Sequence, residues 1–264
     1  MSTPLSGQTA IVSGSTAGIG YAIAEELARN GAAVVVSGRT QARVDAAVAA
    51  LSKAVPGASL RGVAADLSTA EGAAALIAQV PQADILINNV GIFEPRAFAE
   101  IADADWQRLF DANVMSGVRL SRHYLPGMLE RNRGRIVFIS SESALQIPAE
   151  MIHYGMTKSA QIAIASGMAQ LTRGSAVTVN SVLVGPTRSE GVGTFVEQLA
   201  EREGISAADF EKKFFETIRP TSLLRRFIEP VEIARFVAFV ASPAASAING
   251  SALRAEGGLV LSAF

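Results

Sequence analysis

Short runs of apolar and often β-branched residues alternate along the chain with longer stretches in which apolar residues recur at helical spacing. The short runs predict strands at residues 9–13, 33–37, 59–64, 85–88, 134–140, 176–182 and 252–255. Helical patterns occupy residues 19–30, 43–53, 70–79, 103–130, 154–172 and 230–241. Strands that alternate with helices form a parallel sheet through right-handed crossovers. Because the predicted strands are nearly continuously apolar, we expect an α/β fold with helices on both faces of the sheet.

One segment interrupts this alternation. Residues 187–226 contain no predicted strand and carry aromatic residues at Phe195, Phe210, Phe214 and Phe215. Ligands of open α/β sheets bind outside the carboxyl ends of the strands, so a long insertion after residues 176–182 can cover a substrate. The alternative is a pair of surface helices that pack on the core through their phenylalanines. We expect a single domain over residues 1–264, with residues 187–226 as a substrate lid within it.

Composition narrows the class of protein. Hydrophobic residues make up 49% of the 264 residues, enough to cover a buried sheet, and 23 basic against 24 acidic residues give a net charge of −1. This balance gives no electrostatic reason to expect a nucleic acid or a membrane as partner. The absence of cysteine excludes disulfides and cysteine-ligated metals, so we expect a cytoplasmic location. We also expect no signal peptide and no transmembrane span, because the apolar runs are short.

A glycine-rich turn directly follows the first predicted strand. Residues 13–20 read SGSTAGIG, between a strand and a helix. Glycine lets the backbone turn sharply and lets a pyrophosphate approach closely, and the positive end of the following helix attracts the phosphate charge. The spacing is G-x-x-x-G-x-G rather than the commoner G-x-G-x-x-G, and an ordinary structural turn is the alternative. We expect a dinucleotide to be bound here through Gly14, Ser15, Thr16, Gly18, Ile19 and Gly20.

The end of the second predicted strand indicates which dinucleotide binds. An Asp or Glu at this place would hold the ribose hydroxyls of NAD. Here residues 36–40 read VSGRT, with an arginine and no acid. A guanidinium can bind the 2′-phosphate of NADP through two parallel hydrogen bonds, whereas a carboxylate would repel it. The sequence therefore favours NADP(H). NAD(H) is the alternative, in which Arg39 is an ordinary solvent-exposed residue at a helix start.

A serine, a tyrosine and a lysine complete the pattern. Residues 139–141 read ISS after the fifth predicted strand, and residues 154–158 read YGMTK, so Ser141 lies thirteen residues before Tyr154. Together with the glycine turn, these motifs resemble those of the short-chain dehydrogenase/reductase family. The resemblance extends over essentially the whole chain, as far as an E-G-G stretch near the C-terminus. It implies a Rossmann-like, doubly wound sheet of about seven mainly parallel strands.

The resemblance also implies roles for individual residues. Tyr154 would be the general acid/base at the substrate oxygen, Ser141 would orient that oxygen, and Lys158 would also bind the nicotinamide ribose. Asn113 would support a water relay to the lysine; the alternative for Asn113 is a helix-interior residue bonded to nearby backbone. Hydride would pass between the nicotinamide and a carbonyl carbon. Further cofactor contacts would come from Asp66, Leu67, Asn88, Gly91, Gly185, Thr187 and Ser189.

Four positions depart from the family's usual residues, and one of them, Glu256 for an aspartate in the E-G-G stretch, is a conservative change. Val90 stands in place of an alanine, so two extra methyl groups must find room in the packing there. Val184 replaces a proline and Ser189 replaces a threonine, but serine keeps the hydroxyl group. None of these departures removes a catalytic group.

The spacing of Tyr154 and Lys158 supports the assignment on physical grounds. Residues four apart share one face of a helix. A free tyrosine has a pKa of about 10, and an ammonium group close to the phenol favours the phenolate. At about 4 Å and an effective dielectric of about 20, the attraction is roughly 4 kcal/mol, or about three pKa units. We therefore expect Lys158 to lower the pKa of Tyr154 to about 7.

These features together predict an NADP(H)-preferring oxidoreductase that interconverts a carbonyl and an alcohol. The alternatives are an NAD-dependent alcohol or hydroxysteroid-type dehydrogenase and a non-catalytic nucleotide-binding homologue. Because Asn113, Ser141, Tyr154 and Lys158 are all competent residues, the sequence argues against lost activity. Dehydratase or epimerase chemistry would need further acid/base groups, which the sequence does not identify.

The sequence says less about the substrate, the roles of the two histidines and the oligomeric state. The phenylalanines of residues 187–226, with Leu145, Ile147 and Met151, favour a mostly apolar substrate. We interpret His153 as a surface residue or one behind the site, and His123 as structural. The resemblance implies a homotetramer, with a homodimer as the alternative.

Overall fold

The computed structural model describes residues 3–189, 193, 200–201 and 204–263, and within these residues it contains one seven-stranded sheet. The strand order is β3-β2-β1-β4-β5-β6-β7, and every adjacent pair is parallel. The order changes direction beside β1, which is the place where open α/β sheets bind ligands. The strands are β1 (Thr9–Val12), β2 (Ala33–Gly38), β3 (Leu60–Ala64), β4 (Ile85–Asn88), β5 (Gly134–Ser141), β6 (Val177–Val184) and β7 (Ala252–Ala255).

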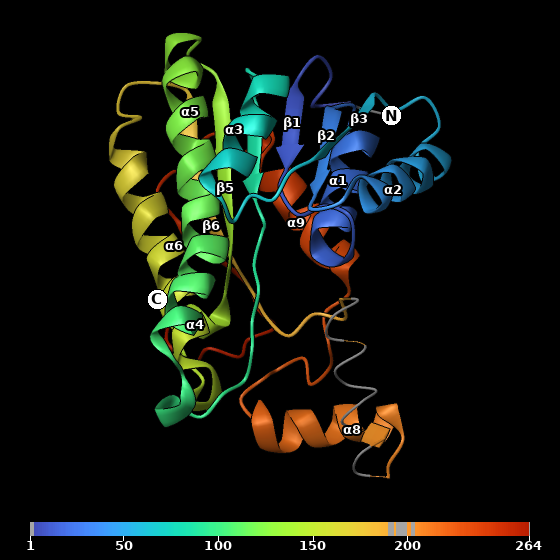
Figure 1. Ribbon diagram of the computed structural model, residues 1–264, viewed down its shortest axis with the longest axis vertical. Helices are drawn as coiled ribbons and strands as arrows, with labels where there is room; N and C mark the ends of the chain where they lie inside the picture. Colours follow the sequence, from blue (N-terminus) through green and yellow to red (C-terminus); the bar gives the residue numbers. More distant parts are fainter. Residues whose placement is uncertain (1–2, 190–192, 194–199, 202–203, 264) are drawn as a thin grey trace.

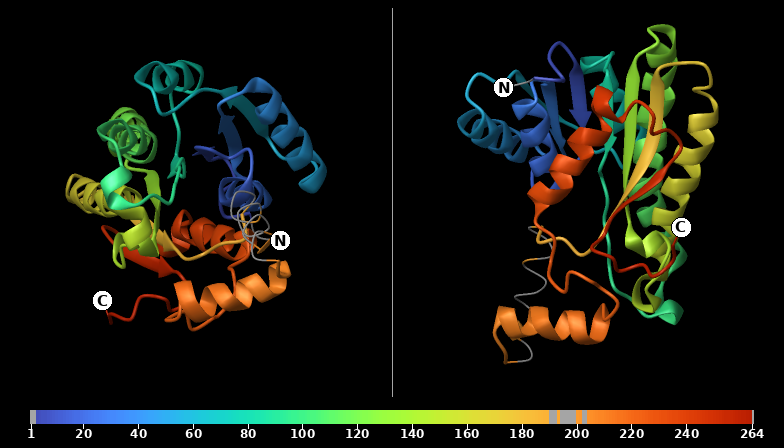
Figure 2. Two further views of the ribbon diagram at one scale, coloured as in Figure 1. Left: turned by 60° about the horizontal axis from the view of Figure 1, so that its bottom comes forward. Right: turned by 180° about the vertical axis from the view of Figure 1, so that it is seen from behind.

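Helices cover both faces of the sheet (Figures 1 and 2), as the alternating pattern predicted. One face carries α1 (Gly18–Arg29), α2 (Gln41–Ala54) and α9 (Pro230–Val240). The opposite face carries α3 (Ala70–Gln79), α4 (Asp103–Phe110), α5 (Ser116–Glu130) and α6 (Ile152–Gln170). Short 3-10 turns are η1 (Phe98–Glu100), η3 (Glu142–Ala144), η4 (Ala149–Met151) and η6 (Pro243–Ala245). No helix in the described part of the chain has the length and apolar character needed to cross a membrane.

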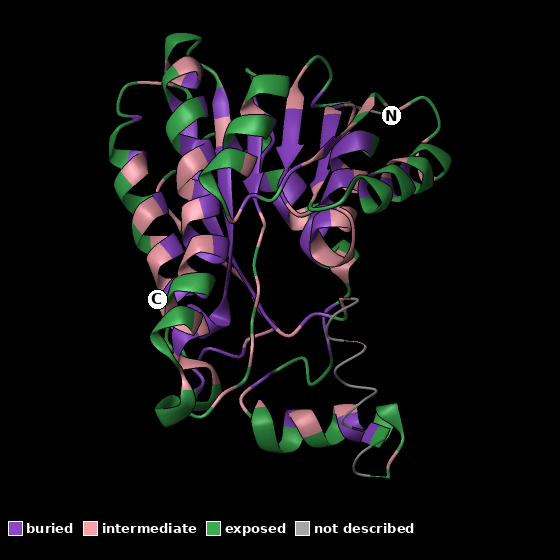
Figure 3. Ribbon diagram, viewed as in Figure 1, coloured by how far each residue is buried: buried purple, intermediate pink, exposed green. Residues whose placement is uncertain are grey.

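Two hydrophobic cores form, because successive side chains of a strand point to opposite faces of the sheet. In β1, Ala10 and Val12 pack in the core under α1 and α9, whereas Ile11 lies in the core under α3 and α5. Figure 3 shows the strands buried and the outer helix faces exposed. The apolar layers thus fix the strands, and the loops at their carboxyl ends are free to carry polar side chains.

The expected helix over residues 103–130 is wrong in one respect. A π-helical turn, η2 (Asp111–Met115), separates α4 from α5. The turn fixes Asn113, whose side chain bonds to the backbone of Ile92. A π-helical turn inserts an extra residue, and such turns are frequent at functional sites. The remaining predicted helices and strands begin and end within two residues of their observed bounds.

The segment after β6 forms a third, small apolar cluster near the carboxyl end of the sheet (Figure 1). Helix α8 (Ala207–Lys213) leads into a π-helical turn, η5 (Phe214–Ile218). Three buried phenylalanines pack together there, at Phe210, Phe215 and Phe227. These side chains therefore build their own cluster instead of packing on the main core. Phe195 lies outside the described residues, and the lid role of residues 187–226 stays a prediction.

Candidate active site

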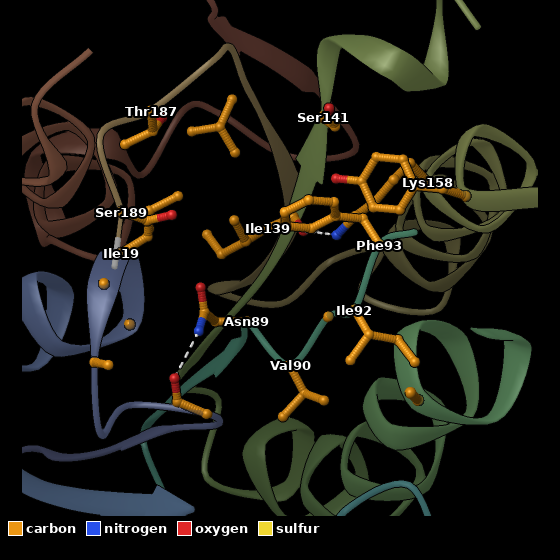
Figure 4. Close-up of a pocket in the computed structure, with 18 of the residues that line it drawn as sticks. Ile19, Asn89, Val90, Ile92, Phe93, Ile139, Ser141, Lys158, Thr187 and Ser189 are labelled. Carbon is orange, nitrogen blue, oxygen red and sulfur yellow. Dashed lines mark hydrogen bonds between the residues drawn. The ribbon is translucent and has the colours of Figure 1, made fainter. Parts of the chain in front are cut away.

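A cavity of about 1560 Å³ lies at the carboxyl ends of the strands, and Figure 4 shows it in close-up. Its wall is formed by the glycine turn after β1, the ends of β2, β5 and β6, the loop after β4 and the start of α6. The cavity therefore joins segments that are far apart in the sequence. Of the predicted site residues, the following line it: Gly14, Thr16, Gly18, Ile19, Gly20, Arg39, Asp66, Leu67, Gly91, Ser141, Tyr154, Lys158, Gly185, Thr187 and Ser189.

The glycine turn has a backbone that side chains would obstruct. Gly14 and Gly18 have φ angles of +63° and +56°, a region that glycine occupies without strain. A Cβ on Gly20 would lie 2.3 Å from the Gly14 carbonyl oxygen and 2.4 Å from Nδ2 of Asn89. The side-chain Nδ2 of Asn89 donates to the backbone carbonyls of Ser13 and Gly14, each at 3.0 Å. A side chain from the loop after β4 thus fixes the turn, and the close packing at Gly20 leaves no room for a side chain there.

We expect Gly20→Ala to lower the free energy of unfolding by about 1–3 kcal/mol, because the new methyl group must displace the Gly14 backbone and the Asn89 amide. Differential scanning calorimetry would measure the effect as a fall in Tm of several degrees. Gly167→Ala is the matched control: a Cβ on this α6 residue meets nothing within 4 Å, so alanine should stabilise by up to about 1 kcal/mol. Equal Tm values for the two variants would contradict the close packing of the turn.

Ser15, Asn88 and Asn113 are predicted site residues that do not line the cavity. The Ser15 hydroxyl donates to the Val12 carbonyl at 2.6 Å and accepts from the Ser37 amide at 3.0 Å, so it joins β1 to β2. Asn88 Nδ2 donates to Ser121 Oγ at 3.0 Å and joins β4 to α5. Their roles here are structural, and Asn89 takes the place on the cavity wall that we expected for Asn88.

Asn113 is buried in η2 and is not bonded to its own helical turn through its side chain. Its Oδ1 accepts from the Ile92 amide at 2.7 Å, and its Nδ2 donates to the Ile92 carbonyl and to Thr157 Oγ1, each at 2.9 Å. Its backbone carbonyl accepts from Gln161 Nε2 at 2.6 Å. Asn113 therefore connects the loop after β4 to α6, which differs from the locally bonded alternative, and its part in a water relay stays a prediction.

Charged groups lie where the adenosine end of a dinucleotide is expected. Arg39 is exposed beside Gly38 at the end of β2, and Arg43 from the first turn of α2 lines the same part of the cavity. Asp66 follows β3, and its carboxylate accepts from the Ser68 amide at 3.1 Å and hydroxyl at 2.7 Å. The described residues thus offer two guanidinium groups at the end of β2, where a carboxylate would select against a 2′-phosphate.

The serine, tyrosine and lysine meet at one side of the cavity. Figure 4 shows Ser141 and Lys158 across the cavity from Thr187 and Ser189. Tyr154 and Lys158 both face the cavity from α6, and Lys158 Nζ lies 5.6 Å from the centre of the Tyr154 ring. The Lys158 ammonium donates to the Ile139 carbonyl at 2.9 Å and to Gln161 Oε1 at 3.3 Å. The spacing argument for a shared helix face is therefore confirmed.

The electrostatics of this group differ from the expectation. Burial, and next the Glu142 carboxylate, raise the pKa of Tyr154 well above its ordinary value, against an opposing effect of Arg219. Burial lowers the pKa of Lys158 to about 8, against an opposing effect of Glu142. The expected fall of the Tyr154 pKa to about 7 is not met, because burial raises this pKa and the Lys158 ammonium bonds to Ile139 and Gln161 rather than to the phenol.

Three residues of the site were not identified from the sequence: Glu142, Gln161 and Arg219. Glu142 and Gln161 did carry a signal, because an acid directly after the buried end of a strand and an amide one turn beyond Lys158 are both unusual. Arg219 carried none, since only folding brings it to the cavity. Leu145 and Ile147, by contrast, are about half exposed and do not line the cavity, whereas Met151 does.

The two histidines are structural in different ways. His153 is fully buried rather than at the surface, and its ring meets the Trp106 ring edge-on at 5.8 Å between centres. Burial lowers its pKa. His123 is exposed on α5, and its Nε2 lies 3.0 Å from the Pro81 carbonyl oxygen. It does not line the cavity. Neither ring contacts the cavity space that a substrate can enter.

The sheet is doubly wound, and a glycine-lined cavity lies where the strand order changes direction, with a serine, a tyrosine and a lysine beside it. This combination defines the nucleotide-dependent oxidoreductases of the α/β class. The sequence model of the short chain dehydrogenase family matches residues 8–200. The chain therefore belongs to the short-chain dehydrogenase/reductase family and is an oxidoreductase.

Relatives resemble the chain over its full length. It is 47% identical to the uncharacterized oxidoreductase YvaG of Bacillus subtilis over 264 residues, which span all of both chains. It is 31% identical to the D-β-hydroxybutyrate dehydrogenase of Cupriavidus necator, over 97% of this chain and 99% of the relative. The structure of L-sorbose reductase from Gluconobacter frateurii with NADPH and L-sorbose superposes with a TM-score of 0.92 at 30% identity, over 99% of this chain and 100% of the other.

Proposed function

We propose that the chain is an NADP(H)-preferring oxidoreductase that interconverts a carbonyl and an alcohol, with Tyr154 as the general acid/base. One observation carries the proposal: Ser141, Tyr154 and Lys158 share the wall of a cavity whose other side is the glycine turn. The D-β-hydroxybutyrate dehydrogenase and the L-sorbose reductase, which are similar over nearly the whole chain, support a substrate that contains a hydroxyl or carbonyl carbon.

The cavity fits a dinucleotide phosphate. The glycine turn would hold the pyrophosphate, and Arg39 and Arg43 would face the 2′-phosphate at the end of β2. The NADPH complex of the similar L-sorbose reductase supports this cofactor. When bound, the nicotinamide supplies or accepts the hydride at the substrate carbon. Lys158 on one side of the cavity and Thr187 and Ser189 across from it would hold the nicotinamide end of the cofactor between them.

In the reduction direction, the chain must deliver one proton to the substrate oxygen as hydride reaches the carbon. The phenol of Tyr154 donates that proton, and Ser141 orients the oxygen. A raised pKa keeps the phenol protonated at neutral pH, which suits donation. The nearby charge of Lys158 then stabilises the phenolate that forms. In the oxidation direction the same residues act in reverse.

The test is a panel of carbonyl compounds and alcohols, followed at the nicotinamide absorbance with NADPH, NADH and their oxidised forms. We expect turnover of members of the panel, with a higher kcat/KM for the phosphorylated cofactor. Tight NADPH binding without turnover of any compound would contradict the catalytic role. A preference for NADH would contradict the cofactor assignment alone.

We expect Gln161→Leu to move the alkaline limb of the kcat/KM profile to lower pH and to lower kcat about tenfold. Gln161 Oε1 accepts from the Lys158 ammonium and so favours its charged form. Without this acceptor the pKa of Lys158 should fall from about 8 to a lower value. The positive charge that stabilises the phenolate is then lost at a lower pH. Initial rates from pH 6 to 10 would measure the shift.

Gln170→Leu, at the exposed end of the same helix, is the control and should leave the pH profile unchanged. Gln161→Glu restores an acceptor for Lys158 and should return the alkaline limb toward higher pH. An unshifted limb in Gln161→Leu would show that the hydrogen bond to Lys158 has no effect on the reaction.

A further inference from the structure

A buried carboxylate lies directly beside the reacting hydroxyl groups and has no part in the proton and hydride transfers described above. Glu142 follows Ser141 at the end of β5, is 5% exposed and lines the cavity. Its carboxylate accepts the hydroxyl hydrogen of Ser141 and, at 3.2 Å, that of Ser143. A carboxylate is rarely buried in a protein unless its charge is compensated. Its position in the cavity wall makes it available to a substrate.

The charge around Glu142 is compensated only in part. Arg219 Nε lies 3.6 Å from Glu142 Oε1, beyond hydrogen-bond distance, and Arg219 Nη1 lies 3.4 Å from Glu150 Oε1. The same guanidinium lies over the Phe214 ring at 5.9 Å. Two carboxylates thus share one guanidinium, and the other cation that acts on Glu142 is the Lys158 ammonium, which bonds to Ile139 and Gln161. The Glu142 carboxylate therefore keeps acceptor capacity for a hydrogen-bond donor and repels an anionic group placed directly beside it.

The hydrogen bond from Ser141 adds a second constraint. A serine hydroxyl has one hydrogen to donate, and in this structure Ser141 donates it to Glu142. Ser141 can donate to a substrate oxygen only if Glu142 gives up that bond. The cost of leaving a buried carboxylate with one partner fewer is large, unless the substrate itself brings another donor. A hydroxyl group on the carbon next to the reacting carbon is such a donor, within reach of a carboxylate that lies one hydrogen bond from the Ser141 oxygen.

We propose that Glu142 is a substrate-binding residue that accepts a hydrogen bond from a hydroxyl on the carbon adjacent to the reacting carbon. The substrates are then neutral hydroxy ketones and, in the reverse direction, vicinal diols. This inference rests on the proposed oxidoreductase function and names its substrate class. It differs from the mostly apolar substrate that the sequence favoured, because Glu142, Glu150 and Arg219 make one end of the cavity polar.

The experiment compares ketones that differ at a single carbon. 2-Butanone, 1-hydroxy-2-butanone and 2-oxobutanoate carry a methyl, a hydroxymethyl and a carboxylate group next to the same carbonyl. 2-Octanone, 1-hydroxy-2-octanone and 2-oxooctanoate repeat the comparison for a longer chain. With NADPH, we expect the kcat/KM of the hydroxy ketone to exceed that of the plain ketone at least tenfold in either series, the size of one hydrogen bond to a charged group. The anionic ketone should be the poorest of the three.

Substitutions then assign the preference to Glu142. Glu142→Leu should reduce the ratio of kcat/KM between hydroxy and plain ketone at least tenfold, with the change mainly in KM. Glu142→Gln keeps a carbonyl acceptor without the charge and should restore part of the ratio. Glu130→Gln, at the exposed end of α5 outside the cavity lining, is the control and should leave the ratio unchanged.

The outcomes separate the two proposals. Failure of both the six ketones and the wider panel to oxidise NADPH would contradict the proposed function itself, whereas failure of the six ketones alone would overturn only the role of Glu142. Turnover with equal kcat/KM for plain and hydroxy ketones, or with the anionic ketone as the best substrate, would leave that proposal intact and overturn the role of Glu142. A ratio that survives in Glu142→Leu would also overturn it.

Discussion

Tyr154→Phe is expected to reduce kcat at least about 1000-fold, while the Kd for NADPH changes less than about threefold. General acid catalysis contributes roughly 10²- to 10⁴-fold, and the substitution removes the only oxygen assigned to that step. Phenylalanine keeps the ring, so the edge contact with Phe93 at 6.1 Å between ring centres should persist. Initial rates give kcat, and quenching of cofactor fluorescence gives Kd.

The Tyr21→Phe variant controls for the loss of a phenol elsewhere. Tyr21 lies in α1 outside the cavity lining, so its variant should retain kcat within about twofold. A Tyr154→Phe variant with near wild-type kcat would refute the general acid/base assignment. A variant that loses NADPH binding to the same extent as turnover would instead show that Tyr154 holds the cofactor.

Arg39→Asp is expected to shift the ratio of kcat/KM for NADPH over NADH by about 100-fold toward NADH. The substitution removes a guanidinium that can bind the 2′-phosphate through paired hydrogen bonds, and it adds a carboxylate that repels the phosphate. The same carboxylate can accept hydrogen bonds from the ribose hydroxyls of NADH. Arg39 is exposed, so folding stability should change little. Steady-state kinetics with both cofactors measures the ratio.

The control is Arg173→Asp, which makes the same change of charge at an exposed turn outside the cavity lining. Its ratio should equal that of the wild type, because a distant surface charge is screened by salt. An unchanged ratio in Arg39→Asp would show that Arg39 does not contact the cofactor. In that case Arg43, which lines the same part of the cavity, becomes the residue to test.

Much of the fold follows from the sequence, because buried parallel strands and amphipathic helices have distinct patterns. The bounds of β4, β7 and α3 coincide with the predictions. The π-helical turn does not follow from periodicity, since Asp111–Met115 contains neither Pro nor Gly to mark a break. Its cause is tertiary: the Asn113 side chain bonds to Ile92, 21 residues away.

The site was predictable where a motif carries it and not where contacts between distant segments do. The glycine turn, Ser141, Tyr154 and Lys158 form motifs, and the structure brings them to one cavity. The direction of the shift in the Tyr154 pKa depends on burial and on the Glu142 carboxylate. The spacing of residues in the sequence does not reveal either of them. The pairing of Glu142 with Arg219 joins residues 77 positions apart. The homotetramer and the cytoplasmic location stay predictions.

The π-helical turn between α4 and α5 has a consequence for protein engineering. A π-helical turn closes hydrogen bonds between residues i and i+5, so it holds one residue more than the i to i+4 turn of an α-helix. Deleting one residue from Asp111–Met115 should therefore return the turn to α-helical geometry and leave α4 and α5 in the same register. The deletion would remove the backbone position from which the Asn113 side chain bonds to Ile92. A chimera that receives this helix from a donor lacking the turn should therefore keep both helices in place and lose the link between the loop after β4 and α6.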